Sequence, residues 1–120
     1  MTLIKTRYRS SEAFLDAYQQ QFLHGGWFVP TRRVYTLGSE VVLDVRFPEL
    51  RSRILLRGYV AWRRPARHVQ DGNRQTRLRA GIGVELHPSE RRARDYLLAI
   101  ARGDVIDLTQ RRHRRRAGNR

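Results

Sequence analysis

Three segments with apolar residues at every second position constrain the fold of this chain most strongly. They cover residues 41–47 (VVLDVRF), 54–62 (ILLRGYVAW) and 76–86 (TRLRAGIGVEL). Successive side chains of a β-strand point to opposite faces of a sheet, so this alternation predicts three strands, each with one buried face. In the second segment the buried face includes Trp62. Residues 71–73 (DGN) are typical of a tight turn and predict a hairpin connection between the second and third segments.

The spacing of the apolar residues changes over residues 88–103 (PSERRARDYLLAIARG). Pro88 and Ser89 are typical of the start of a helix, and Gly103 is typical of a helix end. We therefore predict a C-terminal helix with one apolar face. Its apolar stripe comprises Ala93, Tyr96, Leu97 and Ile100.

The N-terminal part of the chain predicts a short strand followed by a short helix. Residues 2–8 (TLIKTRY) form the expected strand. The helix is expected over about residues 11–20, with Ser10 or Ser11 as its N-cap, because a serine hydroxyl can accept a hydrogen bond from an early backbone N–H. Its apolar face comprises Phe14, Leu15 and Tyr18.

Residues 22–31 (FLHGGWFVPT) read as a strand that is interrupted by Gly25 and Gly26. The segment is too apolar for an ordinary loop and too rich in glycine for an ordinary strand. We interpret the two glycines as a structural turn or bulge. Trp27 and Phe28 are adjacent and would point to opposite faces of a strand, so we expect one of them to be exposed and to mark a protein contact.

These elements together predict a mainly β protein, a small β-barrel or rolled sheet with helices. A chain of 120 residues has room for one domain with a modest core. We expect a single domain over residues 1–109. Residues 110–120 (QRRHRRRAGNR) offer nothing to bury, and we expect them to form a basic, disordered tail.

The charge balance favours acidic partners. The chain has 25 Lys and Arg residues against 11 Asp and Glu residues, a formal net charge of +14, and Lys5 is its only lysine. A field of this sign attracts nucleic acid, nucleotide phosphates, anionic lipid or an acidic protein face. Nonspecific binding of nucleic acid through residues 111–120 and through the strand arginines Arg77 and Arg79 is one possibility. Solubility alone is the other explanation for the scattered arginines.

Several classes of protein are not expected. The chain has no cysteine, its four histidines are scattered, and its serines and carboxylates show no catalytic spacing, so we expect neither an enzyme nor a metal site. No apolar run approaches the roughly 18 residues of a membrane span. The N-terminal residues lack the long apolar region of a secretory signal, which favours the cytoplasm.

Four segments in order resemble the PilZ domain family: GGWFVPT, LGSEVVLDVRFP, RGYVAWRR and AGIGVEL, followed by a terminal helix. The resemblance covers residues 3–102. It implies a six-stranded antiparallel barrel with a C-terminal helix, and the segment RYRSSEAFLDAY resembles a branch of PilZ-like domains with a short N-terminal helix. The best-known activity of the family is binding of the bacterial second messenger cyclic di-GMP.

The family's binding motif is R-x-x-x-R followed by [D/N]-x-S-x-x-G. On this chain the second part reads QFLHGG, in which only Gly26 matches. Gln21 stands at the Asp/Asn position and Leu23 at the Ser position. The upstream arginines Arg7 and Arg9 have the spacing R-x-R. Binding of cyclic di-GMP by the usual mode is therefore not expected.

The leading hypothesis is a PilZ-like adaptor without enzymatic activity. It would act by protein contact, through Trp27 and Phe28, in bacterial motility or type IV pilus-related signalling, with no cofactor. The alternative is a cyclic di-GMP receptor that uses non-standard groups. Its expected nucleotide-binding residues are Arg7, Arg9, Gln21, His24, Gly26 and Arg32.

Overall fold

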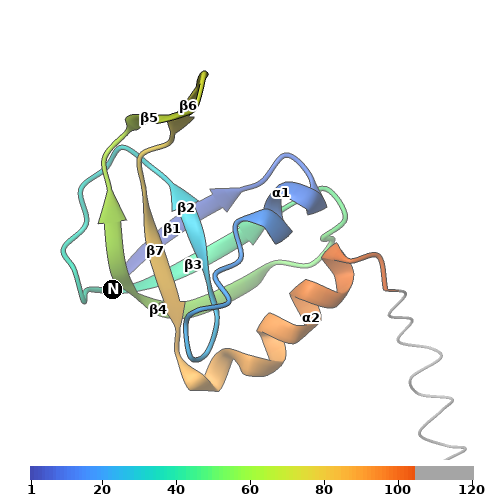
Figure 1. Ribbon diagram of the computed structural model, residues 1–120. Helices are drawn as coiled ribbons and strands as arrows, with labels where there is room; N and C mark the ends of the chain where they lie inside the picture. Colours follow the sequence, from blue (N-terminus) through green and yellow to red (C-terminus); the bar gives the residue numbers. More distant parts are fainter. Residues whose placement is uncertain (105–120) are drawn as a thin grey trace, which may run out of the picture.

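The structure, a computed structural model, describes residues 1–104, and the expected tail and the end of the expected domain lie outside them. The chain is mainly β, with two helices (Figure 1). The strands and helices are β1 (Thr2–Arg7), α1 (Ser11–Asp16), β2 (Gly26–Pro30), β3 (Glu40–Arg46), β4 (Ile54–Arg64), β5 (Arg67–Asp71), β6 (Arg74–Leu78), β7 (Gly81–Leu86), the 3₁₀ turn η1 (Pro88–Glu90) and α2 (Arg91–Ala101).

The main sheet has five strands in the order β1-β3-β4-β7-β2. β1 pairs with β3 in parallel, and the other three pairings are antiparallel. The sheet curls into a half-barrel, and the Tyr8 hydroxyl donates a hydrogen bond of 3.0 Å to the Phe28 carbonyl oxygen on the opposite edge strand. The expected six-stranded antiparallel barrel is not confirmed in this detail, because β1 and β3 run the same way.

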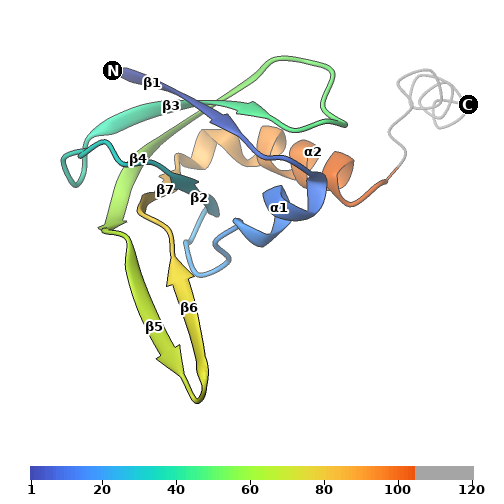
Figure 2. The same cartoon turned by 90° about the horizontal axis from the view of Figure 1, so that it is seen from above.

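The third alternating segment, residues 76–86, divides between two sheets. Its first part is β6, which pairs only with β5 in a separate hairpin that extends away from the main sheet (Figure 2). The turn at residues 71–73 lies at its tip, where Gly72 has a φ of +61°. The prediction of one buried strand is wrong for this part, because Leu78 and Ala80 have no facing layer and remain partly exposed.

The predicted N-terminal helix forms but ends earlier than expected. The Ser10 hydroxyl accepts a hydrogen bond from the Ala13 backbone N–H, which confirms Ser10 as the N-cap. The helix ends at Asp16 because the following backbone turns to the sheet. The Ala17 carbonyl oxygen accepts from the Phe28 N–H at 2.8 Å, and Tyr18 forms an isolated bridge with Trp27.

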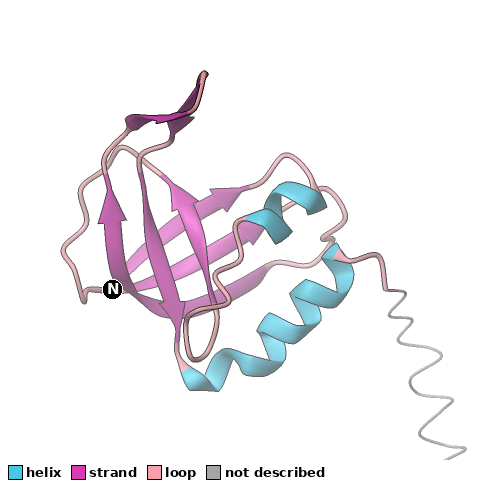
Figure 3. Ribbon diagram, in the orientation of Figure 1, coloured by secondary structure: helices cyan, strands magenta, loops and turns pink. Residues whose placement is uncertain are grey.

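The two helices contact each other and cover the open side of the curled sheet (Figure 3). The C-terminal helix follows a 3₁₀ turn that begins at Pro88, and Gly103 follows its last turn with a φ of +82°, as predicted. Of the predicted stripe only Leu97 is fully buried. Leu98 and Ala101 complete its buried face.

An aromatic cluster around Phe14 forms the centre of the core. The Phe14 ring stacks on Trp27 and Phe47, with centroid distances of 4.7 and 4.5 Å, and meets Tyr8 edge-on at 5.3 Å. Phe14 is fully buried, and its carbonyl oxygen accepts a hydrogen bond of 2.9 Å from the Trp27 indole N–H. A short helix is thereby joined to both edges of the sheet.

We predict that Phe14→Ala lowers the free energy of unfolding by about 3–5 kcal/mol, because it opens a cavity beneath three aromatic rings. Urea denaturation followed by tryptophan fluorescence measures this change. Leu23→Ala is the control: its side chain is 84% exposed, and surface changes of this kind stay within about 0.5 kcal/mol. Similar losses for the two variants would contradict the central role of Phe14.

Candidate functional site

Gly25 and Gly26, which begin the segment GGWFVPT, occupy a tightly packed turn. Gly25 has a φ of +74°, and its carbonyl oxygen accepts a hydrogen bond from the Leu86 N–H at 2.9 Å. A Cβ atom on Gly26 would lie 2.0 Å from the Val84 carbonyl oxygen and 2.8 Å from the Phe22 ring. The positive φ of Gly25 and the packing of Gly26 against β7 are therefore sufficient to explain both glycines, in line with their interpretation as a structural turn.

The residues at the positions of the family's [D/N]-x-S-x-x-G motif do not form a binding site around this turn. Leu23 is 84% exposed, and the Gln21 amide donates to the Gln19 side-chain oxygen at 2.6 Å. The His24 carbonyl oxygen accepts a hydrogen bond of 3.0 Å from Arg94 of α2. The local polar groups thus bind one another and the second helix.

Arg7 and Arg9 lie elsewhere, in a groove with a volume of about 820 Å³ on the outer side of β1 and β3. We call this site the basic groove. Its cationic lining comprises Lys5, Arg7, Arg9, Arg46 and Arg53.

Arg32 lies in a third place, with no residue in common with the basic groove. It lines two adjoining cavities of about 540 and 460 Å³ between the loop after β2, the end of β4 and the segment before β7. The six expected nucleotide-binding residues are therefore divided among three places. The structure does not bring them into one site, because β1 and β2 lie on opposite edges of the sheet.

Of the two expected contact residues, only Phe28 reaches the surface. Trp27 is 1% exposed and belongs to the core. Phe28 points to the outer face of β2, where its ring stacks on Trp62 with a centroid distance of 5.8 Å. The Arg64 guanidinium lies over the Phe28 ring at 4.7 Å. We call Phe28, Trp62 and Arg64 the aromatic platform.

The outward position of Trp62 was missed by the sequence analysis. The pairing of β4 with β7 shifts between Val60 and Trp62, so that Trp62 pairs with Gly83. This bulge moves Trp62 from the inner to the outer face. A Cβ on Gly83 would lie 2.2 Å from the Trp62 ring, and one on Gly81 would lie 2.5 Å from the Phe28 ring. The glycines of AGIGVEL therefore serve as the base of the aromatic platform.

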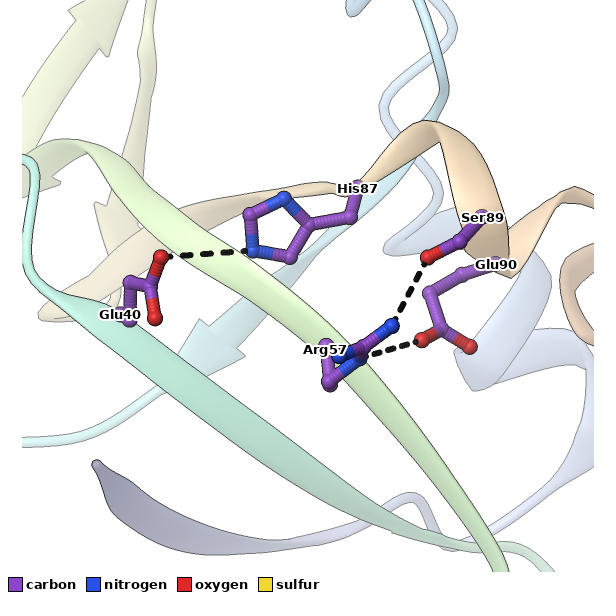
Figure 4. A network of polar contacts seen from close by, with 5 residues as sticks. All are labelled: Glu40, Arg57, His87, Ser89 and Glu90. Carbon is purple, nitrogen blue, oxygen red and sulfur yellow. Dashed lines mark hydrogen bonds and ion pairs between the residues drawn. The ribbon is translucent and has the colours of Figure 1, made fainter.

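A polar network ties the beginning of the C-terminal helix to the sheet (Figure 4). The Arg57 side chain on β4 donates to Glu90 and to the Ser89 hydroxyl, both at 3.1 Å, and His87 lies 3.9 Å from Glu40. Arg57 and Glu40 are more than half exposed. Exposed pairs of this kind contribute little stability, and we interpret the network as an anchor for the helix rather than a catalytic group.

Two tyrosines have a raised pKa, and both remain neutral at ordinary pH. Burial raises the pKa of Tyr8, whose hydroxyl bonds to the Phe28 carbonyl oxygen. A hydrogen bond to the Glu85 carboxylate raises the pKa of Tyr59. In residues 1–104 no three His, Asp or Glu side chains gather in a way that could hold a metal ion.

No protein-family model matches the chain, and no curated protein matches it significantly. Among the described residues, no helix is long and apolar enough to cross a lipid bilayer. The sites described above are therefore the basis on which a function can be assigned to this chain.

We predict that Gly26→Ala lowers the free energy of unfolding by about 2–4 kcal/mol, because the new methyl group would overlap a backbone carbonyl. Gly38→Ala is the matched control. Gly38 has a φ of +82° but open space around it, so only the backbone cost of about 1 kcal/mol applies. Thermal unfolding of both variants distinguishes them. A Gly26 variant as stable as the Gly38 variant would overturn the packing explanation.

Proposed function

We propose that this chain is a PilZ-like domain without enzymatic activity that acts in the cytoplasm as an adaptor, by protein contact. In this proposal the curled sheet is a divergent form of the PilZ barrel, and the process served is bacterial motility or type IV pilus-related signalling. The order of the four sequence segments and the position of the terminal helix against the open side of the sheet support the family assignment.

The aromatic platform is the observation that carries the adaptor proposal. Two aromatic rings lie on the outer face of the sheet, beside glycines that have no side chain to cover them. Aromatic residues and arginines are enriched at protein interfaces, because they combine a large apolar area with a polar group. The half-buried Phe28 and Trp62 match this description.

The charges around the platform indicate an acidic partner. The described residues contribute no acidic side chain to the lining of either cavity beside it, and the exposed Val34 adds an apolar contact to the larger one. Complementary charge speeds association and excludes partners of the wrong sign. Their cationic lining comprises Arg32, Arg33, Arg63, Arg64, Arg77 and Arg79.

We predict that a photo-crosslinking amino acid in place of Phe28 captures a partner protein in the cell of origin, identified by mass spectrometry. The crosslink should disappear in Arg32→Glu/Arg33→Glu, because the reversed charges repel an acidic face. It should persist in Arg91→Glu/Arg92→Glu, which makes the same charge change on exposed residues of α2. The same product from a crosslinker at Leu23, or its persistence after reversal at positions 32 and 33, would contradict the proposal.

The alternative function, a cyclic di-GMP receptor with non-standard arginines, is favoured by one observation. The expected residues Arg7 and Arg9 share the basic groove with three further cations. The glycine turn and Arg32 lie outside that groove. Nonspecific binding of nucleic acid is a further alternative. The basic segment expected to bind, residues 111–120, lies outside the described residues.

We predict that calorimetric titration of cyclic di-GMP into the protein at moderate salt gives no binding heat up to millimolar ligand. The side chains of Gln21 and Leu23 cannot bind a guanine edge in the way that the Asp/Asn and Ser of the family motif do. Arg7→Ala/Arg9→Ala is titrated alongside. Micromolar binding that is lost in this double variant would replace the adaptor proposal with the receptor.

A further inference from the structure

Positive charge gathers in the basic groove because β1 and β3 pair in parallel. β1 and β3 run side by side, and their register places Lys5 opposite Asp44 and Arg7 opposite Arg46. The outward residues of the two strands therefore face the same side. Like charges directly opposite each other on neighbouring strands are destabilising. The Arg7–Arg46 pair thus has an electrostatic cost that an anion would relieve.

Among residues 1–104, Asp44 is the only acidic residue in the lining of the groove. Its side chain is 5% exposed and lies 3.8 Å from the Arg46 Nε and 3.5 Å from the Arg53 Nε. One carboxylate oxygen, Oδ1, has no hydrogen-bond partner among the described residues. A buried carboxylate needs positive charge nearby, so Asp44 holds two guanidinium groups around it.

The position of Asp44 leaves the outer parts of both arginines free. It approaches Arg46 and Arg53 through Nε, and their side chains are 54% and 57% exposed. The terminal nitrogens of a guanidinium can donate to an oxyanion while Nε is engaged elsewhere. One carboxylate against five cations leaves four uncompensated positive charges in the described part of the lining.

We infer that the basic groove binds a soluble linear polyphosphate, a ligand in which two or more phosphate groups are joined in a chain. Its cations come from β1, β3, the segment after β1 and the loop before β4, so they can contact several phosphate groups at once. The volume of about 820 Å³ lies within the range of about 300–1,000 Å³ of small-molecule sites. Asp44 acts as a positioning residue for Arg46 and Arg53.

This inference does not depend on the adaptor proposal, because the groove and the aromatic platform have no residue in common. It shares Arg7 and Arg9 with the cyclic di-GMP alternative but differs from it in the ligand, which is a linear polyphosphate. A protein that binds linear polyphosphate but not the cyclic dinucleotide would leave the adaptor proposal intact and support the groove. Titrations with the two ligands therefore distinguish the two hypotheses.

The test is calorimetric titration of inorganic tripolyphosphate into the full chain at low and at moderate salt. We expect binding that weakens with added salt, because exposed charges are screened. Arg46→Gln/Arg53→Gln should lower the affinity at least about tenfold, since two charge-assisted contacts are lost. Inorganic monophosphate should bind more weakly than tripolyphosphate, because it reaches fewer of the cations.

Arg91→Gln/Arg92→Gln is the matched control, because it removes the same charge from exposed positions of α2 outside the groove. Circular dichroism checks that both double variants keep the fold. A second arm measures sedimentation with vesicles of phosphatidylglycerol and phosphatidylcholine. Equal loss of affinity in the two double variants would overturn the groove as a site. Vesicle binding without tripolyphosphate binding would overturn the soluble ligand in favour of a membrane surface.

Discussion

The packing of Phe14 is the interaction on which the rest of this structure depends. A helix of six residues has little stability of its own. It persists here because its one fully buried ring lies between Trp27 of β2 and Phe47 after β3. These two residues belong to opposite parts of the curled sheet. The ring also meets Tyr8, which follows the edge strand β1, so it links the two edges of the half-barrel, and the hydrogen bond from Tyr8 to Phe28 joins them directly.

The closure of the half-barrel around Phe14 determines where two surfaces lie, the aromatic platform and the basic groove. Trp27 is directed into the core to meet Phe14, and the alternation of a strand then directs Phe28 outward. The bulge in β4 places Trp62 beside it, and the glycines of β7 give both rings space. On the other edge, β1 must lie next to β3 for its apolar residues to reach the same core. Its outward residues Lys5 and Arg7 then lie beside Arg46 of β3, and Asp44 becomes enclosed among them.

The arginines of this chain are consequently not a uniform charged surface. One group surrounds a buried carboxylate and leaves an uncompensated charge in a groove, whereas another surrounds an aromatic platform and two cavities without acids. The first arrangement suits small phosphorylated ligands, and the second suits an extended acidic surface. Total net charge cannot distinguish these roles, because both depend on which side chains share a cavity.

The sequence by itself determined the mainly β class, the positions of most strands, the capping of α1 by Ser10 and the end of α2 before Gly103. These are local properties, set by side-chain alternation and by the hydrogen bonds of a single turn. It also determined that the glycine turn lacks the groups of the family motif. Only the tertiary structure decided that β1 runs parallel to β3, that Trp62 faces outward and that Arg7 meets Arg46 while Arg32 does not. Strand neighbours and bulges depend on contacts between residues far apart in the chain. The alternation of side chains gives each strand two faces but does not specify which strand pairs with it.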